Sequence, residues 1–143
     1  MRELPRKLTA GELAELFSGR TPLVERLAEV EDPLGVGFDA VLGRLGEDEK
    51  AEALAAHPRI GERSPEQHGE EPDVLAQLAA LNRAYEEQFG FRFVVFVDRR
   101  SRRELLPVLR ERLGRIRAEE LDTGLTELVA IARDRWNRRD AAK

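Results

Sequence analysis

The sequence has 143 residues, of which 41% are hydrophobic and 36% charged, and it contains no cysteine. This length predicts one domain, residues 1–143, and the absence of cysteine excludes disulfides, thiolate nucleophiles and Cys-ligated zinc. The net charge of −4 argues against nucleic acid or an anionic membrane as a partner. No apolar run approaches the ~20 residues of a membrane span, and MRELPRKL lacks the apolar region of a secretory signal, so we expect a cytoplasmic protein.

Short amphipathic helices are predicted for the first third of the chain. Thr9–Glu12 has the pattern of a capping box and precedes apolar residues at helical spacing. A second helix is expected after Thr21-Pro22, because Pro is favoured at the first helical position. Residues 35–37 are predicted to form a loop, and residues 38–45 a third short helix.

The next helix is predicted to end at His57. Acidic residues 47–49 favour its N-terminus, and Pro58 disfavours helical geometry at the residue before it. Residues 64–67, Ser-Pro-Glu-Gln, then place Ser at an N-cap and Gln at N3, which predicts a new helix start. The N–H groups of such a start attract anions, here next to Glu66.

The second half of the chain is predicted to contain three longer helices and one segment that is not helical. The first of these helices, opened by residues 71–73, carries an inward stripe with a period of three to four: Val74, Leu78, Leu81, Tyr85 and Phe89. Residues 91–97 have strand-like composition, but the sequence offers no second strand, so we expect a buried extended segment or a short helical turn. A capping box at residues 101–104 opens the next helix, and the last runs from about residue 118 into the 130s. The expected fold is all-α, a single compact bundle of about seven or eight helices with one buried extended segment.

Several motifs in the sequence resemble the OHCU decarboxylase family, whose members act on 2-oxo-4-hydroxy-4-carboxy-5-ureidoimidazoline (OHCU) in the last step from urate to (S)-allantoin. The motifs occur in the family's order across nearly the whole chain: His57-Pro58-Arg59-Ile60-Gly61, Glu66-Gln67, Leu81-Asn82 with Tyr85, Phe89-Gly90-Phe91 with Phe93, and Glu127 with Ile131-Ala132 and Arg135. The resemblance implies an all-α carboxy-lyase of purine catabolism that needs no metal or organic cofactor. It also implies a small-molecule ureidoimidazoline substrate and is compatible with a homodimer.

The resemblance further implies a catalytic pair, His57 and Glu66, in which the imidazole acts as general acid or base. It implies that the remaining site residues bind substrate: Pro58, Gln67, Phe93, Val94, Val95, Phe96, Val97 and Arg135. The residues alone allow other roles, because His57 could cap a helix C-terminus and Glu66 could stabilise a helix N-terminus. A metal site is not expected, since there is no cysteine and no His-x₃-His pair.

One departure from the family pattern keeps two alternatives open. The segment that precedes Glu66 is one residue shorter than in the family, so that Arg63 rather than Ser64 takes the family's serine position. The shorter segment favours a decarboxylase or hydrolase of a related ureide as one alternative. The other is a non-catalytic helical interaction module, which would need the apolar stripes but not a pocket holding His57 and Glu66.

Overall fold

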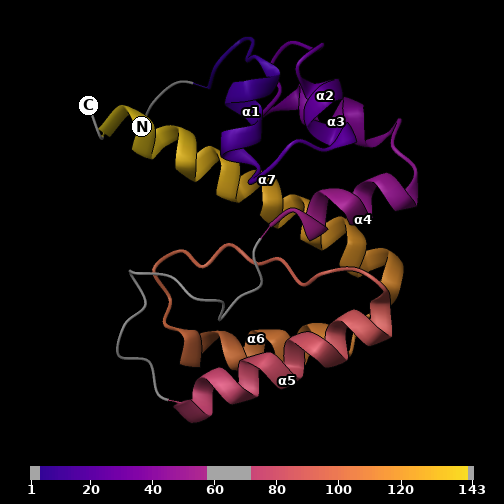
Figure 1. Cartoon of the computed structure of the whole chain (residues 1–143), viewed down its shortest axis with the longest axis vertical. Helices are drawn as coiled ribbons and strands as arrows, with labels where there is room; N and C mark the ends of the chain where they lie inside the picture. The colour runs from indigo at the N-terminus through magenta and orange to yellow at the C-terminus, as the bar shows by residue number, and fades with distance from the viewer. Residues whose placement is uncertain (1–3, 58–71, 142–143) are drawn as a thin grey trace.

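The computed structural model describes residues 4–57 and 72–141 (Figure 1). Those residues form seven α-helices and no strand: α1 Ala10–Leu16, α2 Pro22–Leu27, α3 Val36–Leu42, α4 Glu47–Ala55, α5 Pro72–Phe89, α6 Arg102–Leu113 and α7 Arg117–Ala141. The prediction of an all-α protein with about seven or eight helices is therefore confirmed.

Helix α7 connects two groups of helices. The 25 residues of α7 contact both α1 and α4, which with α2 and α3 form one end of the molecule, whereas α5 and α6 pack against each other at the opposite end (Figure 1). One continuous apolar core runs through both groups and includes residues of every helix. This arrangement brings the ends of α1 and α4 close to the second half of α7.

Side-chain caps explain where several helices begin. The predicted capping box at Thr9 is present, since Thr9 Oγ1 accepts from the Glu12 N–H at 3.1 Å and Glu12 Oε1 accepts from the Thr9 N–H at 3.0 Å. The predicted loop at residues 35–37 is wrong in part, because α3 already begins at Val36. The Asp32 carboxylate accepts a hydrogen bond from the Val36 N–H at 3.0 Å and so satisfies one of the free donors of the helix start.

Residues 92–97 form the buried extended segment that the sequence predicted, without a partner strand among the described residues. Side chains take the place of that strand. Arg112 Nη1 donates to the Val94 carbonyl at 2.8 Å, and Glu127 Oε1 accepts from the Phe96 N–H at 3.2 Å. These bonds satisfy backbone groups that would otherwise be costly to bury.

A buried ionic network ties this segment to three helices. Glu120, which is fully buried, accepts hydrogen bonds from the Tyr85 hydroxyl at 2.6 Å, from Arg112 Nε at 2.7 Å and from Arg115 Nη1 at 3.0 Å. The Arg112 guanidinium also lies 4.5 Å from the centre of the Phe93 ring. The network joins α5, α6 and the first turn of α7, and it fixes the buried side of the extended segment.

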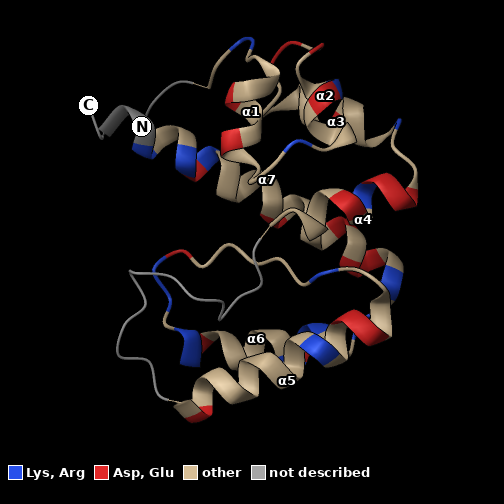
Figure 2. Cartoon of the chain, in the orientation of Figure 1, with Lys and Arg blue, Asp and Glu red and all other residues tan. Residues whose placement is uncertain are grey.

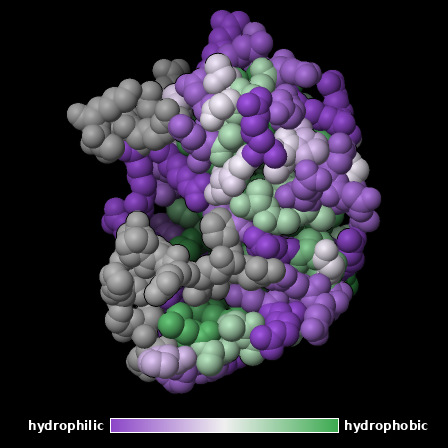
Figure 3. Space-filling view, in the orientation of Figure 1, coloured by the Kyte–Doolittle hydropathy of each residue, from purple (hydrophilic) through white to green (hydrophobic). Residues whose placement is uncertain are grey.

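Hydrophilic residues cover much of the surface shown in Figure 3, with hydrophobic residues interspersed among them. None of the helices among the described residues is long and apolar enough to cross a membrane.

Candidate active site

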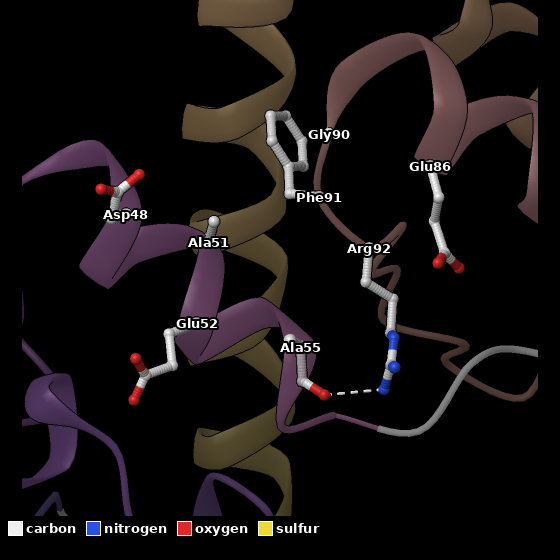
Figure 4. A pocket seen from close by; sticks show the side chains of 8 residues that line it. All are labelled: Asp48, Ala51, Glu52, Ala55, Glu86, Gly90, Phe91 and Arg92. Atoms are coloured by element: carbon white, nitrogen blue, oxygen red, sulfur yellow. Dashed lines mark hydrogen bonds between the residues drawn. The ribbon is translucent and has the colours of Figure 1, made fainter.

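His57 directly follows the C-cap of α4, as predicted, and Arg92 holds this end of the helix through two backbone carbonyls. Arg92 Nη1 donates to the carbonyls of both Ala55 and His57, each at 2.7 Å, and Figure 4 shows the side chain extending to Ala55. Arg92 and Ala55 also line a hollow of about 370 Å³ between α4 and the end of α5. The guanidinium thus satisfies carbonyls that a helix C-terminus leaves without partners and fixes the position from which the imidazole projects.

Arg135 of α7 lies close to His57. Its Nη1 donates to the Leu16 carbonyl at 2.9 Å and to Ser18 Oγ at 2.7 Å, and Ser18 Oγ lies 3.5 Å from His57 Nδ1. Among the described residues, these contacts use only one of the three guanidinium nitrogens. Within the described parts of the chain, the other two, Nη2 and Nε, have no hydrogen-bond partner and could contact a bound molecule.

A pocket of about 510 Å³ lies beside these side chains. It is lined by one histidine, part of the extended segment with the turn that follows, and one side of α7: His57, Val95, Phe96, Val97, Asp98, Arg99, Arg100, Ile131, Asp134, Arg135 and Arg138. This volume suits a small organic molecule. The structure therefore brings His57, Val95–Val97 and Arg135 together around one cavity.

Two of the residues predicted to bind substrate do not line this pocket. Phe93 and Val94 are each only 1% exposed and belong to the core. Phe93 packs edge-on against Tyr85, with ring centres 5.2 Å apart, and so holds the extended segment from its buried side.

The backbone of the extended segment is only partly available to a ligand. Arg100 donates from Nη2 to the Phe96 carbonyl at 2.6 Å and from Nε to the Val97 carbonyl at 3.0 Å, and the Phe96 N–H is bound by Glu127. Within the described parts of the chain, the N–H groups of Val95 and Val97 and the Val95 carbonyl have no such partner. These three groups are the ones that could bind a planar polar molecule.

The electrostatics of the pocket favour a neutral histidine and an anionic ligand. Burial, then the charges of Arg135 and Arg92, lower the pKa of His57 to about 4. Among the described residues, four arginines and two aspartates (blue and red in Figure 2) line the pocket, although the whole chain carries a net charge of −4.

The other predicted site residues, Pro58, Glu66 and Gln67, lie outside the described residues. Within the described residues, no group of three or more His, Asp or Glu side chains is placed to hold a metal ion. Sequence reasoning missed Ser18, Arg92 and Arg100, which contact the site residues. The sequence marks these residues only by their position. Ser18 follows a predicted helix, Arg92 begins the extended segment and Arg100 follows it.

Known proteins similar to this chain agree with the architecture. A curated 2-oxo-4-hydroxy-4-carboxy-5-ureidoimidazoline decarboxylase from Halalkalicoccus jeotgali is 29% identical over 98 residues, which cover 60% of this chain and 56% of that protein, so the chain spans about half the length of this relative. A crystal structure of OHCU decarboxylase in the presence of (S)-allantoin superposes with a TM-score of 0.73 at 23% identity, over 87% of this chain and 94% of that one. A crystal structure of (S)-allantoin synthase gives a TM-score of 0.68 at 24% identity, over 88% of this chain and 47% of that one. At these identities, the two structures show a shared fold.

The sequence model of the OHCU decarboxylase family matches residues 2–137, which is nearly the whole chain. The motifs from His57 to Arg135 all fall within this match. The chain therefore belongs to the OHCU decarboxylase family.

Proposed function

We propose that the protein is a carboxy-lyase that converts OHCU to (S)-allantoin. The observation that carries this proposal is the convergence of His57, Arg135 and the Val95–Val97 backbone on one positively charged pocket. Membership of the family supports the same reaction. A non-catalytic interaction module would not need a neutral imidazole and a partly unpaired arginine in one cavity.

The substrate's own structure makes this chemistry accessible without an added electron acceptor. Its carboxylate is attached to a carbon that bears a hydroxyl and adjoins a ring C=N. When the bond to CO₂ breaks, the electron pair forms a new C=C, the electrons of the C=N pass to its nitrogen, and that nitrogen takes up a proton. The enol that results loses its hydroxyl proton and gains a proton on the neighbouring carbon, and the face of that addition sets the (S) configuration.

The pocket residues have complementary tasks in this reaction. Arg135 offers two guanidinium nitrogens, which suit a two-point contact with the carboxylate or the ureido oxygen. The Val95 and Val97 backbone would orient the planar ring. Neutral His57, assisted by Glu66, would move the hydroxyl and carbon protons, and positioned proton transfer of this kind contributes about 10²–10⁴-fold in rate.

The test is to generate OHCU freshly from urate with urate oxidase and hydroxyisourate hydrolase and to follow the product by circular dichroism. We expect rapid formation of (S)-allantoin, whereas spontaneous decay gives the racemate. A racemic product formed at the spontaneous rate would refute the proposal. Rapid turnover of other ureides, but not of OHCU, would favour the alternative of a related decarboxylase or hydrolase.

Replacing Arg135 tests its assigned role. We expect Arg135→Met to lower kcat/KM by about 10²–10³-fold, because a charged contact with the substrate is lost. Arg133→Met is the matched control on the same helix, since Arg133 Nε donates to the Leu34 carbonyl at 2.6 Å and does not line the pocket. If the two variants were equally active, Arg135 would not bind the substrate.

The remaining expectations concern assembly and location. We propose a homodimer, with which the resemblance to the family is compatible, and a cytoplasmic location, as expected from the sequence. Light scattering of the purified protein tests whether it is a dimer. A monomer at micromolar concentration would contradict this proposal.

A further inference from the structure

Ser18 adopts a backbone conformation that normally favours glycine. Its φ is 67°, in the left-handed region, and it follows Phe17, the C-cap of α1. The next N–H, of Gly19, donates to the Ala14 carbonyl at 2.9 Å, which closes the helix end as in a Schellman motif. In this motif glycine is the usual residue at the position that Ser18 occupies, because a side chain there costs free energy.

The Ser18 hydroxyl makes two contacts that glycine could not make. It accepts a hydrogen bond from Arg135 Nη1 at 2.7 Å and lies 3.5 Å from His57 Nδ1. A guanidinium can only donate, so the contact with Arg135 uses a lone pair of the hydroxyl. The single hydroxyl proton can then point towards His57 Nδ1, and in that arrangement Nδ1 is the acceptor.

The surroundings of His57 are consistent with a neutral ring in this arrangement. Among the described residues, Arg135 of α7 and Arg92 of the extended segment act on its charge, and the other charged residues of the pocket are Asp98, Arg99, Arg100, Asp134 and Arg138. A neutral imidazole carries its proton on only one nitrogen. If Nδ1 accepts from Ser18, that proton lies on Nε2, which is then the nitrogen available to a ligand.

We propose that Ser18 is a positioning residue, which holds His57 in the tautomer protonated on Nε2 and connects it to Arg135. Ser18 does not line the pocket, so it acts through these two side chains rather than by touching a substrate. The catalytic consequence rests on the proposed function, whereas the tautomer can be measured without any substrate.

Ser18→Gly separates this role from a purely structural one. Glycine suits the left-handed backbone, so we expect an unchanged or higher Tm, but the loss of the hydroxyl should lower kcat/KM about tenfold or more, mainly through kcat. Ser18→Ala is the control, since it also lacks the hydroxyl but keeps the strained backbone. It should lose the same activity and have a lower Tm than Ser18→Gly. Full activity in Ser18→Gly would overturn the proposed catalytic consequence.

Nitrogen-15 NMR of the imidazole rings measures the tautomer directly. The sequence has two histidines, so a His68→Gln background identifies the signals of His57. We expect the Nε2-protonated pattern at pH 7 and a mixture of tautomers after Ser18→Gly. An Nδ1-protonated ring, or a pattern that Ser18→Gly leaves unchanged, would overturn the role of Ser18. If the NMR spectrum showed the Nε2-protonated pattern but the protein did not act on OHCU, the proposed function would be refuted while the role of Ser18 would stand.

Discussion

Two arginines bound to backbone carbonyls have different surroundings in this molecule. Arg112 lies in the core, pairs with fully buried Glu120 and bonds the Val94 carbonyl. Arg135 also bonds a carbonyl, but it borders a pocket and none of the ion pairs among the described residues engages it. Both guanidiniums are partly removed from water, yet among the described residues only Arg112 forms an ion pair with a buried carboxylate.

The difference suggests which polar groups maintain the fold and which serve chemistry. Arg112 leaves Nη2 without a hydrogen-bond partner, but its carboxylate partner and the Phe93 ring balance its charge. The hydrogen-bond partners of Arg135 within the described parts of the chain are a carbonyl and a hydroxyl, which are neutral, so its charge could attract an anion. We therefore expect the stability of the protein to depend mainly on the surroundings of Arg112, and its activity on those of Arg135.

The largest expected effect on stability comes from removing Glu120. Glu120→Ala leaves the Arg112 charge buried without its counter-ion, and we expect the free energy of unfolding to fall by about 3–5 kcal/mol in urea titrations. Glu119→Ala is the matched control, because Glu119 is the adjacent acid and lies 4.0 Å from Arg115 with its side chain 54% exposed. That change should cost less than about 0.5 kcal/mol. Similar losses in the two variants would show that the buried network does not dominate stability.

A smaller effect should appear as pH falls around His57. The unfolded chain binds a proton at this histidine near pH 6.5, whereas in the folded protein burial and two arginines lower the pKa to about 4. Between these values the unfolded state holds more protons, so stability should decrease as the pH is lowered from 6.5 to 4, by about 3 kcal/mol in total. The check is to compare urea unfolding of the wild type and His57→Gln at several pH values. The variant should lose this part of the pH dependence, and parallel curves would contradict the prediction.

The contrast between the two regions also shows what the sequence could and could not predict. The apolar stripe of α5, the capping boxes at Thr9 and Ser101 and the buried extended segment were predictable, because each depends on residues close together in the chain. The predicted helix start at residues 64–67 lies outside the described residues. The network of Glu120 was not predictable from the sequence. Tyr85 is 35 residues away along the chain and Arg112 is on another helix, and neither stands out from other polar residues in the sequence. Ser18 was missed for a related reason. Its positive φ leaves no local pattern in the sequence, and its partners His57 and Arg135 are separated from it by 39 and 117 positions.

Within the network, the Tyr85 hydroxyl should contribute less than the charges. Tyr85→Phe removes the 2.6 Å bond to Glu120 but leaves both arginines on the carboxylate, so we expect a loss of about 1–2 kcal/mol. Tyr85 is the only tyrosine, and burial and the bond to Glu120 raise the pKa of its hydroxyl. Its phenolate absorbance in the wild type should therefore appear only when the protein unfolds at high pH. Absorbance that titrates near pH 10 in the folded protein would mean that the network is open to water.

The smallest effect should come from Gly124, where α7 approaches α4. A Cβ built there would lie 3.3 Å from both terminal methyl carbons of Leu54, which is fully buried three residues before His57. Alanine favours a helix by about 1 kcal/mol over glycine, but crowding in a packed core costs about 1–3 kcal/mol. We therefore expect Gly124→Ala to lower stability by about 0–2 kcal/mol. Combining it with Leu54→Ala makes room for the methyl group, so the pair should be more stable than the sum of the single changes predicts. If the stability changes of the two substitutions simply added, the contact between Gly124 and Leu54 would not set the distance between α4 and α7. It would then not set the distance between His57 and Arg135 either.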